Sequence, residues 1–333
     1  MSKHAEGVFL GAYAAYASLE PRTRFTERDF LHALQTNPRL RGLELPFVQD
    51  IHEEEPHDFL QRLPQNWEYV WTLLPGTMQA LQKSPHYGLA SCDKAGQKAA
   101  LDRCELARLR IVDWHQQAGR TLVRAVHLHS APTRGGKGVD SDAGALRSAL
   151  ETLSARDWAG AKLILEHCDA YRSGQTPRKG FLELDDEIAL ARDLKLGISI
   201  NWGRSVLEGR SIETAEQHIL KAKQAGVLQG LFFSGTAVQD PLYGDWQDNH
   251  APIRLDDSAE WQPQQGLLGL TEVKHALALV QDEAQVMLGL KVQPFPVSLT
   301  WHQRLACVEG QLAAMRELMR EQAGAASLTL VKA

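Results

Sequence analysis

Charged, amide and imidazole side chains stand at the ends of otherwise apolar runs in this sequence. A buried strand does not readily end in such a group, because burying a charge without a partner is costly. The residues concerned are Glu44, His127, His129, Glu166, His167, Asp169, Asn201, Arg204, Lys291 and Gln293. We therefore expect these positions to include a binding or catalytic site.

Glu166 and Lys291 are the strongest candidates for chemistry. A positioned carboxylate can remove a proton next to a carbonyl group, and an ammonium group can stabilise the negative charge that develops. We predict that Glu166 is the general base and that Lys291 is its electrostatic partner. A Lys in a dry site can also form a Schiff base. A structural Lys–Glu ion pair is the alternative without chemistry.

The run Val-His-Leu-His places two imidazoles close together in the sequence. We expect only one of His127 and His129 to point inward, because side chains alternate along a strand. His129 is assigned to the catalytic group and His127 to substrate binding. Glu44, His167 and Asp169 are also predicted to bind substrate, and ordinary roles at a strand end or loop entry are the alternative.

Basic, aromatic and amide residues indicate the kind of substrate. Arg204 and other cations of the predicted loops suggest an anionic group such as a carboxylate, sulfonate or phosphate. Solvated surface charges explain such residues equally well. Trp246 offers a flat face for a sugar ring, or it packs a loop. Asn201, Ser234 and Gln293 complete the predicted substrate-binding set.

Short apolar runs alternate with amphipathic stretches, a pattern typical of βαβ units and a parallel sheet. The predicted strands cover residues 8–14, 42–48, 69–74, 122–129, 161–168, 197–201, 230–234 and 286–293. The predicted helices cover 26–35, 58–63, 97–117, 142–156, 181–194, 213–225 and 271–282, with a last helix from 298. Eight such repeats predict an α/β fold, the (β/α)8 TIM barrel, whose chemistry lies at the carboxyl ends of the strands.

We expect one domain over residues 1–333, since barrels of this kind commonly run to about 250 residues or more as one unit. The irregular stretch at about 236–269 follows the seventh predicted strand, and we expect it to act as a lid-like loop. Because strand ends share one barrel mouth, Glu44, Glu166, Asn201 and Lys291 are predicted to converge in one pocket.

Charge and cysteine usage favour a small-molecule partner. With 36 Lys+Arg against 41 Asp+Glu, the net charge of −5 creates no field that attracts nucleic acid or an anionic membrane. The four cysteines lack Cys-x-x-Cys spacing, which indicates reduced thiols. The apolar run at 8–19 resembles a signal-peptide core, but its tyrosines favour a buried strand. We expect a cytoplasmic protein with no nucleic-acid or membrane partner, and homo-oligomerisation stays open.

The order of these strand-end motifs resembles the xylose-isomerase-like TIM-barrel superfamily, which includes sugar isomerases, ketose 3-epimerases and endonuclease-IV-type barrels. The resemblance covers essentially the whole chain and points to a bacterial branch. Members typically hold a divalent metal through Glu, Asp, His and Glu on strands five to eight. Those positions here carry Glu166, Asn201, Ser234 and Lys291. Because an ammonium group repels a divalent ion, we predict no metal at these positions and no cofactor.

A displaced metal site is the alternative that the residue types leave open. It would combine His127 or His129 with Glu166, His167 and Asp169, which are all legitimate ligand types. No fixed spacing of a known motif supports it.

The resemblance implies an isomerase or epimerase of carbohydrate metabolism that acts on a sugar or sugar acid. One alternative is a glycoside hydrolase or lyase that pairs Glu166 with Asp169 or Glu44. Another is a non-catalytic barrel that only binds a metabolite. An endonuclease role is the weakest, because it needs more metal ligands and a basic groove that follows phosphates.

Overall fold

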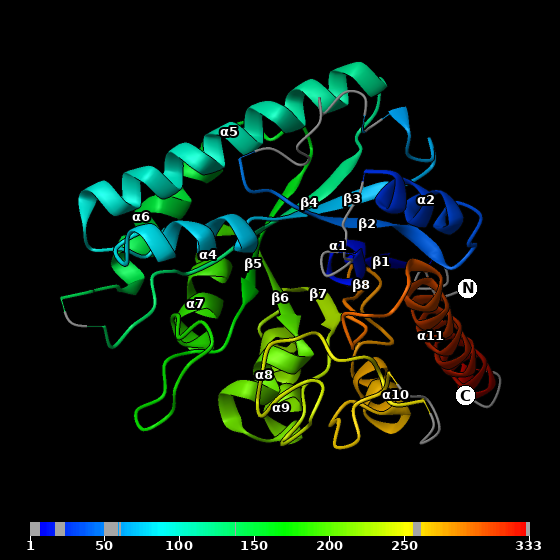
Figure 1. Ribbon diagram of the computed structural model, residues 1–333. Coiled ribbons are helices and arrows are strands. Elements are labelled where there is room, and N and C mark those ends of the chain that lie inside the picture. The colour runs from blue at the N-terminus through cyan, green and yellow to red at the C-terminus, as the bar shows by residue number, and fades with distance from the viewer. Residues whose placement is uncertain are drawn as a thin grey trace. The chain divides into compact units, whose positions relative to one another are not determined.

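Eight parallel strands follow one another in chain order and close into a barrel in the computed structural model. The structure describes residues 7–16, 24–49, 59, 61–136, 138–255 and 261–330. The strands, labelled in Figure 1, are β1 (Val8–Leu10), β2 (Leu40–Pro46), β3 (Glu68–Thr72), β4 (Val123–Leu128), β5 (Lys162–His167), β6 (Gly197–Asn201), β7 (Leu228–Phe233) and β8 (Met287–Leu290). The predicted (β/α)8 barrel is thereby confirmed.

The chain divides into two compact units, here called unit 1 and unit 2. Unit 1 comprises Met1–Leu43, Asn201–Leu220 and Gly230–Ala333, and unit 2 comprises Glu44–Ile200 and Lys221–Gln229. In unit 1, β1 pairs with β2 and β8, and β7 pairs with β8. In unit 2, β4 pairs with β3 and β5, and β5 pairs with β6. The single domain and the lid-like loop stay predictions, and residues 256–260 of that loop lie outside the described residues.

All eight predicted strands are present, and the largest difference concerns β1. We expected this strand to run to residue 14, but it ends at Leu10, and helix α1 (Ala12–Tyr16) follows Gly11. The apolar run continues into α1 because Ala12, Ala14 and Ala15 are buried. A continuous apolar run does not by itself distinguish a strand from a buried helix.

The strands alternate with helices as expected, and three short helices were not predicted. In addition to α1, the helices are α2 (Arg24–Leu34), α4 (Leu74–Lys83), α5 (Lys94–Ala118), α6 (Ala143–Ser154), α7 (Leu184–Leu194), α8 (Trp202–Gly209), α9 (Ile212–Gln224), α10 (Leu270–Leu279) and α11 (Trp301–Leu330). The unpredicted helices α1, α4 and α8 each begin within two residues of a strand end. The predicted helix at 58–63 lies largely outside the described residues. In the described part of the chain, no helix is long and apolar enough to cross a membrane.

An aromatic cluster fixes β3 in unit 2. Trp71 stacks on Phe47 with ring centroids 5.6 Å apart and meets Trp114 of α5 edge-on at 5.2 Å. Tyr69 also packs edge-on against Trp114, at 5.8 Å, and Figure 1 shows α5 alongside β3 and β4. Such pairs stabilise beyond the area that they bury. Because Thr72 of β3 is the register partner of His127, the cluster also holds the end of β4.

Candidate functional site

Two buried histidine–glutamate pairs lie at the end of β4 in unit 2. His127 Nδ1 is 3.4 Å from Oε1 of Glu44 on β2. His129 follows β4, and its Nε2 is 2.8 Å from Oε2 of Glu166 on β5. All four side chains are at most 1% exposed. Groups buried this deeply need partners. The His129–Glu166 contact is a hydrogen bond, whereas the longer His127–Glu44 contact is not.

The expectation that only one of the two histidines points inward is wrong, since both histidines lie beside Glu166. Side chains two residues apart lie on the same face of a strand, so His127 and His129 share a face and Leu128 takes the other. Leu128 is the register partner of Leu165. His129 directly follows Leu128, and Glu166 directly follows Leu165, so the two strands bring His129 and Glu166 side by side.

His129 also lines a small cavity in unit 2. The cavity has a volume of about 10 Å³, and Tyr87 and Cys104 are among its lining residues. Burial raises the pKa of Tyr87 to about 12 and the pKa of Cys104 to about 12. Both groups therefore stay protonated at neutral pH and do not act as bases. His129, which contacts Glu166, is a lining residue whose side chain can accept a proton.

His167 belongs to a second hydrogen-bonded chain that the sequence analysis only partly foresaw. Its Nδ1 is 2.7 Å from Oε2 of Glu187 on α7. Ser130 Oγ donates to Oε1 of the same carboxylate and accepts from the backbone N–H of Leu182. Glu187 is 1% exposed, and a buried acid within the apolar face of a helix is the sequence signal that could have identified it. The substrate-binding role of His167 stays a prediction.

Asp169 holds the loop that follows β5. Its carboxylate accepts from the backbone N–H groups of Arg178 at 2.7 Å, Lys179 at 2.9 Å and Gly180 at 3.3 Å. Gly180 has a φ of +63°, and a Cβ there would lie 2.8 Å from Pro177, so a glycine is required. These contacts favour the ordinary loop-entry role that we gave as the alternative for Asp169.

Three side chains of unit 2 are placed to hold a metal ion. Glu44, His127 and Glu166 each offer one ligand atom, and these atoms lie within 4.8 Å of one another. Two carboxylates and one imidazole form a donor set that suits zinc or manganese. The group shares His127 and Glu166 with the displaced site considered above, but it takes Glu44 in place of His167 and Asp169.

The same geometry bears on the glycosidase alternative. Inverting glycosidases need carboxyl groups about 6.5–9.5 Å apart, and retaining ones about 5–5.5 Å. The ligand atoms of Glu44 and Glu166 lie within 4.8 Å, and Glu44 also pairs with His127. The Asp169 carboxylate already accepts hydrogen bonds from the backbone of its own loop. The spacing therefore disfavours an inverting mechanism for Glu44 and Glu166.

In unit 1, Asn201 and Arg204 build the start of α8. Asn201 Oδ1 accepts from the backbone N–H of Arg204 and so caps the helix. The Arg204 side chain is 2% exposed, and its Nε donates to Oδ2 of Asp248 at 3.1 Å. Because Asp248 belongs to the loop after β7, this ion pair ties that loop to α8. Roles of Asn201 and Arg204 in substrate binding stay predictions.

Ser234 lies in a Ser–His–Asp cluster whose geometry differs from that of a hydrolase triad. Ser234 Oγ is 2.7 Å from His250 Nδ1, and Asp248 Oδ1 is 3.5 Å from the same nitrogen. In a triad the serine and the aspartate contact opposite ring nitrogens, so that one nitrogen takes the serine proton while the aspartate holds the N–H of the other. The cluster therefore holds the loop in place, and Ser234 is not an activated nucleophile.

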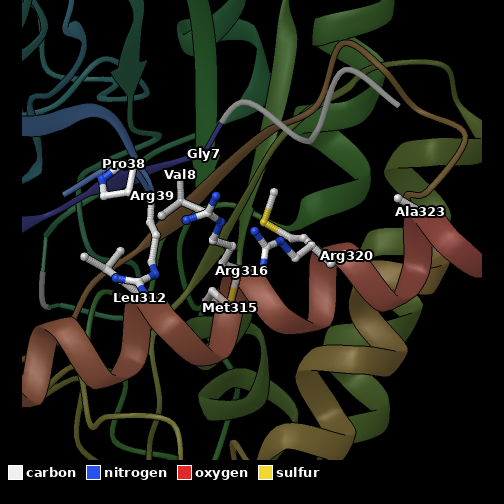
Figure 2. Close-up of a pocket in the computed structure, with 10 residues that line it drawn as sticks. Gly7, Val8, Pro38, Arg39, Leu312, Met315, Arg316, Arg320 and Ala323 are labelled. Carbon is white, nitrogen blue, oxygen red and sulfur yellow. The ribbon is translucent and has the colours of Figure 1, made fainter. Parts of the chain in front are cut away.

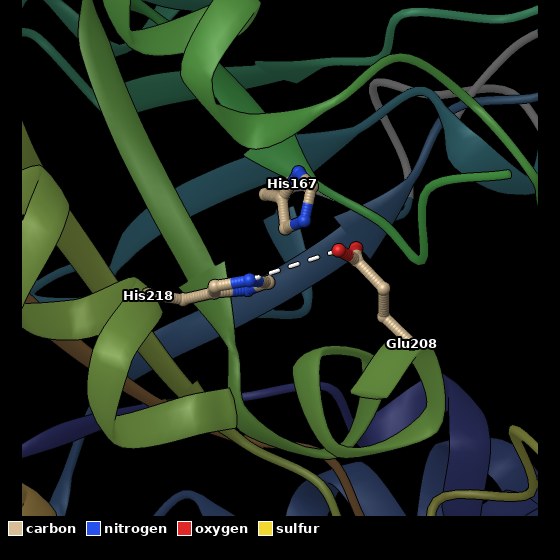
Figure 3. Close-up of side chains that lie close together, drawn as sticks. All are labelled: His167, Glu208 and His218. Carbon is tan, nitrogen blue, oxygen red and sulfur yellow. Dashed lines mark ion pairs between the residues drawn. The ribbon is translucent and has the colours of Figure 1, made fainter. Parts of the chain in front are cut away.

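A further buried pair in unit 1 joins α8 to α9. Glu208 Oε1 is 3.7 Å from His218 Nε2, and His218 Nδ1 is 3.0 Å from Ser205 Oγ. Figure 3 shows the Glu208–His218 ion pair as a dashed line. Neither residue was predicted from the sequence, because both lie within helices and not at strand ends.

The remaining predicted residues of unit 1 have identifiable neighbours. Lys291 is fully buried, and its Nζ lies 5.3 Å from the ring centroid of Phe232. The backbone N–H of Gln293 donates to the carbonyl oxygen of His250 at 2.8 Å. The guanidinium carbon of Arg210 lies 4.7 Å from the centroid of the Trp246 ring, which is a cation–π contact.

Comparison with known proteins identifies the family of this chain. The family model of DUF4862, described as a domain of unknown function, matches residues 9–307. The chain belongs to the DUF4862 family. A relative, the uncharacterized protein STM3670 of Salmonella typhimurium, is 32% identical over 320 residues, which are 96% of this chain and 99% of the relative.

Solved structures similar to this DUF4862 chain share its barrel fold. A Rhodospirillum rubrum protein provisionally assigned as a xylose isomerase has a TM-score of 0.55 and 14% identity, with 94% of this chain and 98% of that chain covered. An Anabaena variabilis protein provisionally assigned as a sugar phosphate isomerase/epimerase has a TM-score of 0.55 and 12% identity, covering 95% and 99%. The xylose-isomerase-like architecture expected from the sequence is confirmed.

The DUF4862 chain does not fit the four-ligand metal site that the resemblance implies. Asn201 caps a helix, Ser234 bonds His250, and Lys291 brings an ammonium group. These side chains supply neither a carboxylate nor an imidazole to the three positions after Glu166. Glu44 and Glu166 lie together in unit 2, whereas their convergence with Asn201 and Lys291 of unit 1 stays a prediction.

Proposed function

We propose that this DUF4862 chain is an isomerase- or epimerase-like enzyme that moves a proton at a carbon next to the carbonyl group of a sugar or sugar acid. The buried His129–Glu166 pair, with its 2.8 Å contact, is the observation that carries the proposal. The sugar class comes from similar structures provisionally assigned as xylose isomerase and sugar phosphate isomerase/epimerase. A fold alone does not define a reaction, so the side chains must carry the mechanism.

Glu166 is the proposed general base, and His129 is the residue that positions it. When Glu166 is ionised its carboxylate can only accept hydrogen bonds, so His129 Nε2 must carry the hydrogen and donate to Oε2. Oε1 of Glu166 is then the proposed acceptor of the substrate proton. In a dry site this charge-assisted hydrogen bond stabilises the carboxylate and fixes its orientation.

The His127–Glu44 pair is the proposed second acid–base group. An isomerase removes a proton from one carbon and delivers it to a neighbouring position, so a second proton carrier nearby is useful. The nearest side-chain atoms of His127 and Glu44 lie 3.4 Å apart, and each side chain can take up or release a proton. Their ligand atoms lie within 4.8 Å of Glu166. A role for Lys291 as the group that stabilises the enolate stays a prediction.

Hydrogen exchange with solvent tests the proposal across a range of candidate substrates. The protein is incubated in D2O with a panel of aldoses, ketoses, sugar acids and their phosphates, and proton NMR follows the C–H signal next to each carbonyl. We expect at least one compound to lose that signal catalytically. A compound that binds but is recovered without deuterium would support the metabolite-binding barrel, and release of a sugar from a glycoside would support the hydrolase.

A divalent metal held by Glu44, His127 and Glu166 is the second candidate, supported by their closely spaced ligand atoms. Such an ion would polarise a substrate carbonyl oxygen. In this case the purified protein should bind about one Mn²⁺ or Zn²⁺ per chain, measured by elemental analysis after dialysis and by Mn²⁺ EPR. Loss of a residue that only contacts a metal ligand weakens metal binding by about 10–100-fold. Glu44→Gln and His127→Gln should each weaken metal binding by more than this, because each removes a ligand.

The exposed carboxylate of Glu151 on α6 provides the matched control for the metal experiment. Glu151→Gln removes the same charge and should bind metal as the wild type does. Wild-type protein that binds no metal, or Glu44→Gln protein that binds as tightly as the wild type, would rule out this second candidate.

A further inference from the structure

A cavity of about 130 Å³ lies in unit 1, between the start of β1, the residues before β2 and helix α11. Figure 2 shows its lining, with Arg316 and Arg320 on α11 and Arg39 on the other side. The cavity lies at the amino-terminal end of β1, whereas Lys291 follows the carboxyl end of the parallel neighbour β8. The proposed reaction therefore does not use this cavity.

In the part of the chain that the structure describes, three guanidinium groups provide the formal charge of the lining. These lining residues include Arg39, Arg316 and Arg320 and no Asp or Glu. Among the residues that the structure describes, none forms an ion pair with these three arginines. Nε of Arg39 is buried, and no hydrogen-bond partner for it lies among the described residues. The cavity therefore presents donors and positive charge that a bound anion would satisfy.

The arginines place like charges close together, although Arg320 is exposed and Arg316 is half-buried, so that solvent screens part of the repulsion. Arg316 and Arg320 are four residues apart on α11, so they lie on the same face of the helix, where like charges repel. Arg39 brings a third positive charge to the same cavity. Its backbone is held in place, because the N–H of Val8 donates to its carbonyl oxygen at 3.0 Å. An anion between the three groups would relieve the repulsion and accept charge-assisted hydrogen bonds.

The floor of the cavity is apolar. Val8 is 2% exposed, and Leu312 and Met315 are fully buried. Met319 lies one turn further along α11. Methionine side chains adapt to irregular apolar shapes, so the floor can accept a small hydrocarbon body. The lining thus combines a site for an anionic head with a site for a short apolar body.

We propose that this cavity binds the phosphate monoester of a small molecule with an apolar body. A phosphate monoester carries about −1.5 to −2 charge at neutral pH and three acceptor oxygens. Three guanidinium groups match that charge better than they match a single carboxylate, and their planar forks fit phosphate oxygens. The site is distinct from the His–Glu pairs of unit 2 and does not depend on the proposed reaction.

Calorimetry with three probes tests the site on the full-length protein. Phenyl phosphate should bind with a Kd below about 1 mM, inorganic phosphate should bind more weakly, and benzoate should bind most weakly. Arg316→Ala and Arg320→Ala should each weaken binding of phenyl phosphate by about tenfold, since each removes charge-assisted hydrogen bonds. Arg316→Lys should retain part of the affinity, because it keeps the charge but loses the fork.

Arg192 on α7 is an exposed arginine of unit 2 and provides the matched control. Arg192→Ala should bind phenyl phosphate as the wild type does, and circular dichroism melting should show that all variants are folded. The proposal is overturned if no probe binds, if benzoate binds as tightly as phenyl phosphate, or if Arg192→Ala weakens binding as much as Arg316→Ala.

Discussion

Replacing Glu166 with Gln should lower the rate of deuterium exchange into the substrate by about 10²–10⁴-fold, the usual contribution of a general base. The amide keeps the shape of the side chain but cannot accept a proton at physiological pH. His129 would lose its charged partner at 2.8 Å while remaining buried. Exchange rates from proton NMR and melting temperatures from circular dichroism give the two measurements.

Comparison with two other variants separates chemistry from folding in the Glu166 experiment. His129→Gln should slow exchange less than Glu166→Gln, since it removes the residue that positions the base rather than the base itself. Glu151→Gln changes an exposed carboxylate on α6 and should leave exchange unchanged. Full activity in folded Glu166→Gln protein would remove Glu166 from the mechanism.

Replacing Arg304 with Met should produce the largest loss of stability in unit 1. This guanidinium is fully buried and donates to the carbonyl oxygens of Ala15, Pro294, Val297 and Leu299 at 2.9–3.2 Å. Methionine fills much of the volume but leaves those carbonyl groups without their donor. Each unsatisfied buried group costs about 1–3 kcal/mol, so we expect a loss of at least about 3 kcal/mol in the free energy of unfolding.

Chemical denaturation measures the free energy of unfolding of Arg304→Met. Arg304→Lys should also be destabilised, because one ammonium group cannot reach all of the carbonyl oxygens that the planar fork reaches. Glu309→Met changes an exposed residue of the same helix and should alter the free energy of unfolding by no more than about 0.5 kcal/mol. A stable Arg304→Met protein would show that this network contributes little to the fold.

The sequence predicted the barrel because its strand signal is repeated eight times. An error of a few residues at one strand, as at β1, leaves the count unchanged. The short helices were harder to predict, because a helix that begins at a strand end leaves no loop to mark it. Asn201 illustrates the difficulty: it is the last residue of β6 and also the cap of α8.

The candidate site was predictable only where it lies at strand ends. His129 and Glu166 were found because each follows or ends an apolar strand. Glu187 and His250 were missed because one lies in a helix and the other in a long loop. Their importance depends on which side chains they contact, and periodicity carries no information about such contacts.

We propose that Glu166 on β5, positioned by His129 after β4, moves the proton, and that a bound metal does not. The most direct test is the exchange rate of wild-type protein in D2O after exhaustive dialysis against EDTA, with substrate identified from the sugar panel. Our account predicts that the metal-free protein retains its exchange rate and that added Mn²⁺ or Zn²⁺ does not raise it. Loss of exchange on dialysis, with recovery when one equivalent of metal is restored, would contradict the account.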